Sequence, residues 1–197
     1  MKRSAIILIM FVLIALSLGG CIKNSYNNLV TMEEAINGDW AQVENQYQRR
    51  YDLVPNLVAT VSAYAEHEKE TFIQVTEARA KVGQLSMTPE ILNDPLMLEK
   101  FQAAQASLRS ALSRLMAVAE NYPQLKANQN FLALQDQLEG TENRIAVERR
   151  RFNEAVREYN RSIRLFPTVI YAGWLGFEKR PYFEAVNEAA TAPKVAF

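Results

Sequence analysis

The chain has 197 residues, 49% hydrophobic and 22% charged, with only 7 Gly and 7 Pro; this is typical of a folded protein and disfavours disordered and turn-rich all-β classes. Its 22 Lys and Arg balance 22 Asp and Glu, so it lacks the basic excess with which proteins bind nucleic acid. A single Cys excludes an intramolecular disulfide and a Cys-based zinc site, and a single His disfavours zinc binding and His-dependent catalysis, so we predict no metal, no cofactor and no enzymatic activity.

The N-terminus has the pattern of a secretory signal. Lys2 and Arg3 precede an uncharged apolar run over residues 5–18, which is shorter than the ~20 residues that span a bilayer comfortably. The following residues, Leu18-Gly19-Gly20-Cys21, resemble the lipobox of bacterial lipoproteins. We therefore predict a lipoprotein signal peptide over residues 1–20 and lipidation of Cys21, with membrane lipid as the partner through the acylated Cys.

The alternative for this segment is an uncleaved anchor helix with an incidental Cys. Both alternatives place the rest of the chain on the extracytoplasmic face of a membrane, which in a diderm cell is the periplasmic side of the outer or the inner membrane. Ile22 rather than Asp follows the Cys, as in lipoproteins that are sorted to the outer membrane.

A polar stretch over residues 21–30 is expected to form a tether, and helical periodicity then extends over residues 31–82. Thr31 and Glu34 form a capping box at the start of this helix, and Gly83 is a stop signal at its end. Pro55 interrupts the pattern, because it lacks an N–H and clashes with the preceding turn. It either kinks one continuous helix or reverses the chain to make two antiparallel segments.

Two more long helices are predicted, over residues 96–120 and 126–165, with helix-start residues at Asn93-Asp94-Pro95 and a stop at Phe166-Pro167. The last helix carries an apolar face of heptad spacing in which Thr141 and Glu148 are the polar exceptions. The apolar tail residues 169–177 either pack over the end of the bundle or form a partner or membrane-interface surface.

These elements predict an all-α fold, an elongated antiparallel up-down bundle of three to four long helices with coiled-coil-like heptads and a short C-terminal tail. With two tight reversals, the first half of the first helix and the last half of the third would overhang at opposite ends, whereas a break at Pro55 would give four antiparallel segments and cover them.

Polar residues follow one face of the first helix and one face of the last, and we predict a partly buried polar network where the two faces meet. The candidate residues are Arg49, Asp52 and Asn56 in the first helix and Glu142, Arg149, Asn153 and Asn160 in the last.

Several motifs together resemble the LemA family over the whole mature chain, residues 31–197 in particular. They include Gln48-Arg49-Arg50-x-Asp52-Leu53-Val54-Pro55-Asn56, Tyr64-Ala65-x-His67-Glu68, Ala78-Arg79, Tyr122-Pro123-x-Leu125-Lys126, Leu138-x-Gly140-x-Glu142-Asn143, Arg149-x-x-x-Asn153, Tyr159-Asn160 and Phe166-Pro167. The resemblance implies an all-helical, membrane-attached bacterial envelope protein and implies no catalytic residues.

The resulting hypothesis is a non-catalytic envelope lipoprotein, a scaffold that presents its helical bundle to an envelope protein partner. An alternative is a small-ligand binder or an enzyme that uses the polar ladder of Glu142, Arg149, Asn153 and Asn160. Self-association through the long helices is a third possibility.

Overall fold

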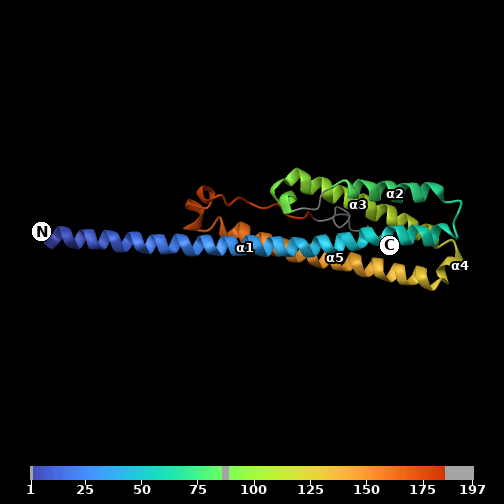
Figure 1. The fold of residues 1–197 in the computed structure, drawn as a ribbon, viewed down its shortest axis with the longest axis horizontal. Coiled ribbons are helices and arrows are strands. Elements are labelled where there is room, and N and C mark those ends of the chain that lie inside the picture. The colour runs from blue at the N-terminus through green and yellow to red at the C-terminus, as the bar shows by residue number, and fades with distance from the viewer. Residues whose placement is uncertain (1, 86–88, 185–197) are drawn as a thin grey trace, which may run out of the picture.

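Helix α1, Lys2–Ser62, is the longest element and projects far beyond the rest of the molecule (Figure 1). The computed structural model describes residues 2–85 and 89–184. The other elements are α2 Lys69–Gly83, η1 Pro89–Asn93, α3 Pro95–Ala119, α4 Pro123–Lys126, α5 Gln129–Ser162, η2 Thr168–Ile170 and η3 Gly173–Leu175. Within the described residues every regular element is helical, which confirms the predicted all-α class.

The long helices form two layers, and consecutive long helices run in opposite directions. Helix α1 packs along α5, and α2 packs along α3 on one side of that pair (Figure 1). Four of the helices are long, and the predicted elongated up-down bundle is confirmed.

The segment predicted to be a tether, residues 21–30, is helical and belongs to α1. Thr31 does not cap a helix: its hydroxyl donates to the Asn27 carbonyl oxygen at 2.8 Å, as inside a continuous helix. Tertiary contacts hold this segment in place, because Leu29 is buried and the Tyr26 ring packs edge-on against Phe177 at 5.4 Å. A polar composition therefore did not interrupt the helix where packing was available.

Pro55 neither ends nor reverses α1, which continues to Ser62. A proline leaves the carbonyl four residues earlier without its helical partner, and here that carbonyl belongs to Tyr51. Arg79 of α2 donates to this oxygen through Nε at 3.3 Å and lies over the Tyr51 ring, 3.9 Å from its centroid. The neighbouring helix thus satisfies the backbone group that Pro55 exposes.

The chain reverses over residues 63–68, about two turns beyond Pro55. A series of short-range backbone hydrogen bonds forms the turn, including Tyr64 N to Val61 O and Glu68 N to Ala65 O at 3.0 Å, and the buried Ala65 fixes it to the core. Because the reversal makes four segments rather than three, the free ends of α1 and α5 lie at the same end of the bundle. Of the two alternatives, the three-segment arrangement with overhangs at opposite ends is wrong; the four-segment arrangement is present, although its reversal lies beyond Pro55.

The buried apolar residues form two clusters, one on each side of Arg50. The proximal core, nearer the projecting N-terminus, contains Leu29, Ile36, Trp40, Val43, Tyr47, Ile91, Leu92, Leu98, Phe101, Ile145, Phe152, Val156, Tyr159, Ile163, Ala172, Phe177 and Phe183. The distal core contains Val54, Leu57, Val61, Ala65, Val75, Ala78, Val82, Leu108, Ala111, Leu112, Leu115, Ala119, Leu125, Phe131 and Leu138.

Candidate functional site

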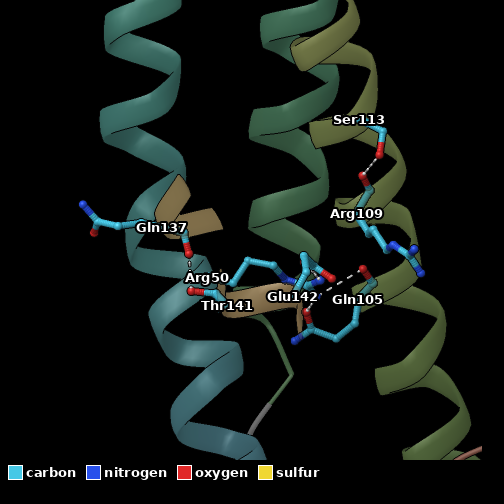
Figure 2. A network of polar contacts seen from close by, with 7 residues as sticks. All are labelled: Arg50, Gln105, Arg109, Ser113, Gln137, Thr141 and Glu142. Atoms are coloured by element: carbon cyan, nitrogen blue, oxygen red, sulfur yellow. Dashed lines mark hydrogen bonds and ion pairs between the residues drawn. The ribbon is translucent and has the colours of Figure 1, made fainter. Parts of the chain in front are cut away.

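A buried polar layer separates the two cores and joins three helices. Arg50 of α1 is only 2% exposed, and its Nη1 donates to Glu142 Oε1 of α5 at 2.5 Å. Its Nη2 donates to the side-chain oxygen of the buried Gln105 of α3 and, at 3.4 Å, to the Gln105 carbonyl. Figure 2 shows Arg50, Gln105 and Glu142 converging between the helices, with Thr141 beside them donating to the Gln137 carbonyl at 2.7 Å.

Besides these hydrogen bonds, the Arg50 guanidinium contacts an aromatic ring. The Tyr47 ring lies 5.1 Å from its guanidinium carbon, at cation–π distance. Burial raises the pKa of Tyr47, and the nearby Arg149 and Arg50 charges offset this only in part, so the phenol stays neutral. Among the described residues, Nε of Arg50 and Nε2 of Gln105 lack a hydrogen-bond partner. The layer therefore holds a desolvated charge, and we predict that the ion pair fixes the register of the helices more than it stabilises the fold.

The predicted network is wrong for its first-helix members. Arg49, Asp52 and Asn56 are exposed, and Asp52 accepts a hydrogen bond from Gln48 of its own helix at 2.8 Å. The buried position is Arg50, one residue and about 100° around the helix from Arg49. Its signal was present in the sequence, because Arg50 occupies the apolar stripe three residues after Tyr47 and four before Val54.

Glu148, the second polar exception in the stripe, does not meet Arg50. It pairs with Arg151 of the same helix, whose Nη1 lies 3.1 Å from Glu148 Oε1. Gln105 of α3 was not singled out either, although it lies in the buried stripe between Phe101 and Leu108. A polar residue at a stripe position of three different helices was the signal for the layer.

The last-helix residues Asn153 and Asn160 hold the extended C-terminal segment, residues 178–184. Asn160 donates to the Arg180 carbonyl at 2.8 Å and accepts from the Arg180 amide at 2.9 Å. Asn153 makes the same pair of bonds to Phe183, at 3.0 and 2.9 Å. Seven helical residues rise about 10.5 Å and three extended residues about 10 Å, so the two spacings match.

Two further side chains complete this attachment. Arg149 Nη2 donates to the Glu184 carbonyl at 2.7 Å, and its guanidinium carbon lies 4.6 Å from the Phe183 ring centroid. Gln102 of α3 accepts from the Glu184 amide at 3.1 Å. The ladder thus brings Arg149, Asn153 and Asn160 together on one segment, while Glu142 belongs to the polar layer.

Glu33 links α1 to the same segment. Its Oε1 accepts from the Tyr159 hydroxyl and from Arg180 Nη2, both at 3.0 Å. Burial and then the Glu33 carboxylate raise the pKa of Tyr159 well above its usual 10.0. A phenol kept protonated in this way is a hydrogen-bond donor and is poorly suited to act as a base.

These polar groups engage one another and the main chain. Both Asn amides use their oxygen and their nitrogen on the backbone of residues 180 and 183. The grooves beside them are shallow and open, lined by residues such as Arg149, Arg157 and Tyr182. In the described part of the chain no three His, Cys, Asp or Glu side chains form a group that could hold a metal ion.

The N-terminal projection has a different surface. Its described side chains between Ile6 and Leu16 are exposed and apolar, and α1 is long and apolar enough at this end to cross a membrane by length and composition. Cys21 is exposed where this stretch ends.

The sequence pattern of the LemA family matches residues 39–197. Two similar proteins are "Magnetosome protein MamQ 1" and "Magnetosome protein MamQ 2" of Paramagnetospirillum magneticum, each 29% identical in an alignment of 175 residues that covers 81% of this chain. A third is "Magnetosome protein MamQ" of Magnetospirillum gryphiswaldense, 29% identical in an alignment of 174 residues that covers 80% of this chain. The alignments cover 64% of each relative, so the chain spans less than two thirds of their length.

Proposed function

The chain belongs to the LemA family, and on this premise we propose that it is a membrane-anchored, non-catalytic protein of the cell envelope that acts as a scaffold. One observation carries the proposal. The apolar stretch, Cys21 and the first segment of the bundle lie on one continuous helix, α1, so attachment through either the stretch or Cys21 presents the whole bundle on one side of the bilayer.

Lipidation of Cys21 is the proposed mode of attachment. The thiol is exposed at the end of the apolar stretch, where a membrane-bound acyltransferase would meet it. Two or three acyl chains, at ~0.8 kcal/mol per buried CH₂, anchor a protein without further contacts. The bundle then lies on the extracytoplasmic face, which in a diderm cell is the periplasmic side.

Labelling with an alkyne fatty acid tests this attachment. We expect the wild type to be labelled and to begin at Cys21 by intact mass, Cys21→Ser to be unlabelled, and Ser25→Ala, a matched change one turn away, to be labelled as wild type. An unlabelled wild type that retains residues 1–20 and resists alkaline carbonate would contradict lipidation but not anchoring. A wild type that carbonate extracts would contradict both.

A ligand-binding or enzymatic use of the ladder is the second candidate. Its groups are the right kind to bind a polar ligand, but Asn153 and Asn160 hold the chain's own backbone. A ligand would therefore have to displace residues 178–184. This competition favours the scaffold proposal, because the ladder has a structural task that accounts for its spacing.

The scaffold's partner is proposed to be an envelope protein or a second copy of this chain. Light scattering on the detergent-solubilised full chain separates these: a concentration-dependent dimer mass supports self-association, and a monomer at high concentration contradicts it.

A further inference from the structure

We propose that the apolar cap at the proximal end of the bundle inserts into the interface of the same membrane that anchors the chain. The apolar cap is the exposed set Leu165, Phe166, Val169, Ile170 and Trp174, which follows α5 and spans η2 and η3. This inference rests on the proposed membrane attachment and adds a second contact with the lipid.

Buried residues next to the cap hold it against the bundle, while the cap residues themselves are exposed. Tyr171, Ala172 and Phe177 are buried and fix this region to the proximal core. Phe166, which precedes them in the chain, is 80% exposed, and Trp174, which lies between Ala172 and Phe177, is 88% exposed. Five large apolar side chains that are exposed within ten residues of a well-packed segment mark an interaction site.

The position of the cap indicates that a membrane surface covers it. The Phe177 ring, beside the cap, packs on Tyr26 of α1, and Figure 1 shows this region lying at the end of the bundle from which α1 projects. Residues 4–22 carry no charge, and at about 1.5 Å per residue they span roughly 28 Å, close to the ~30 Å of a hydrocarbon core. The first charge after them is Lys23, so the membrane boundary falls about one turn before Tyr26.

Both modes of anchoring lead to the same level. An uncleaved helix leaves the bilayer near Lys23, and an acylated Cys21 would itself lie at the lipid surface. In each case the cap lies beside the part of α1 that is closest to the headgroups. A lipid bilayer is therefore the surface that the anchor brings to the cap.

The chemistry of the cap fits this interface. Trp and Tyr are enriched at the boundary between lipid and water, where their rings are apolar and their N–H or O–H groups remain hydrated. Exposed Arg164 directly precedes the cap in the sequence, and a cationic side chain at this depth attracts anionic headgroups.

The two Trp residues make the test specific. Trp40 is 1% exposed in the proximal core, whereas Trp174 is 88% exposed, so the difference between wild type and Trp174→Phe isolates the cap. The full chain is reconstituted in phosphatidylcholine–phosphatidylglycerol vesicles, and only the floated fraction is measured. The lipids carry bromine either near the headgroup end of the acyl chain or near its terminus.

We expect the Trp174 emission to be blue-shifted in vesicles and quenched, more strongly by bromine near the headgroup end. The emission of Trp174→Phe, which reports Trp40 alone, is expected to be insensitive to brominated lipid. A Trp174 that is quenched by aqueous iodide and not by bromine overturns the inference. So does a Trp174 protected from both quenchers, which indicates a protein or a second copy on the cap.

Flotation distinguishes the two proposals. A chain that floats without bromine quenching of Trp174 overturns only the cap. A chain that does not float overturns the membrane attachment and the cap together.

Discussion

The proximal and distal cores share α1, α3 and α5 but are built from different side chains. The distal core is mainly Val, Leu and Ala on four long helices, in the interlocking pattern of a regular bundle. The proximal core is rich in aromatic rings: Trp40 lies 5.7 Å from Phe101 and 5.9 Å from both Phe152 and Phe183. Its fourth side is the extended segment 178–184 rather than a helix.

The difference follows from the length of α2. Helix α2 ends at Gly83, where an added Cβ would lie 2.9 Å from Tyr51 Oη. Because Tyr51 directly follows Arg50 in α1, α2 reaches only the level of the polar layer. Beyond it the core loses a helix, and large rings and an extended chain fill the space. An extended segment cannot satisfy its own backbone groups, so side chains must do so. The Asn ladder of α5 is therefore a consequence of a bundle that changes from four helices to three.

The largest expected effect comes from breaking the layer between the two cores. Replacing Glu142 by Ala leaves the buried Arg50 charge uncompensated, which costs about 3 kcal/mol of unfolding free energy. This is the low end of the range for buried pairs, since Glu142 is 30% exposed. Urea denaturation of the full chain in detergent measures the change.

The control is Glu154→Ala, which removes an exposed carboxylate from the same helix and should change the stability little. Equal losses for the two variants would show that removing Glu142 does not leave Arg50 as an uncompensated buried charge.

A smaller and local effect is expected for Asn153→Ala. Two hydrogen bonds to the Phe183 backbone are lost, at a cost of about 2 kcal/mol. Amide exchange at residues 178–184 should accelerate, and trypsin should cut after Lys179, while protection of the distal core stays unchanged. Faster exchange in the proximal half alone would show that the two cores unfold independently.

Asn143→Ala serves as the matched control, because Asn143 is exposed on the same helix. Loss of protection in both cores of Asn153→Ala would show that the two halves unfold as one unit.

In the distal half, Arg79→Ala is expected to cost about 1 kcal/mol, because the Tyr51 carbonyl loses its donor. In a Pro55→Ala background the helix regains an N–H for that carbonyl, so the same substitution should cost less. A double-mutant cycle in urea gives this coupling. Additive losses would show that Arg79 does not compensate for Pro55.

The smallest effect concerns pH. Burial, followed by repulsion from Glu148, raises the pKa of Asp39 above its usual 3.8, and Arg151 opposes this shift. The folded state thus binds this proton more tightly than the unfolded chain, so stability falls as pH rises from below 3.8 through the folded-state pKa. Asp39→Asn should slightly raise the melting temperature at pH 7 and lose that advantage in acid.

Thermal melts from pH 3 to pH 7 measure the difference, with Asp136→Asn, an exposed carboxylate of α5, as control. A gain for Asp39→Asn that grows in acid would contradict the direction of the shift.

Local signals explain which parts of this fold could be predicted. Helix α3 was predicted over residues 96–120 and runs Pro95–Ala119, because Asp94 caps its first turn by accepting from the Leu96 amide at 2.9 Å. The reversal at residues 63–68 has no Gly or Pro, and long-range packing around Ala65 sets it instead. Such a turn leaves no local signature.

The candidate site divides in the same way. Asn153 and Asn160 stood out because they repeat at heptad spacing, yet their partner is backbone in an aperiodic tail, which no side-chain pattern announces. Arg50 was missed because its neighbour Arg49 fits a polar face equally well, and only the buried stripe distinguishes the two.

The unbroken course of α1 sets a distance as well as a connection. From Ile22 to Ser62 the helix rises about 60 Å, so the loop at residues 63–68 lies about that far along α1 from Ile22. Because α1 is continuous from Ile22 to Ser62, a tilt or rotation of its first turns moves the far end of the bundle with it. For the membrane-anchored protein proposed above, α1 therefore sets the greatest height above the membrane at which a partner can contact the bundle.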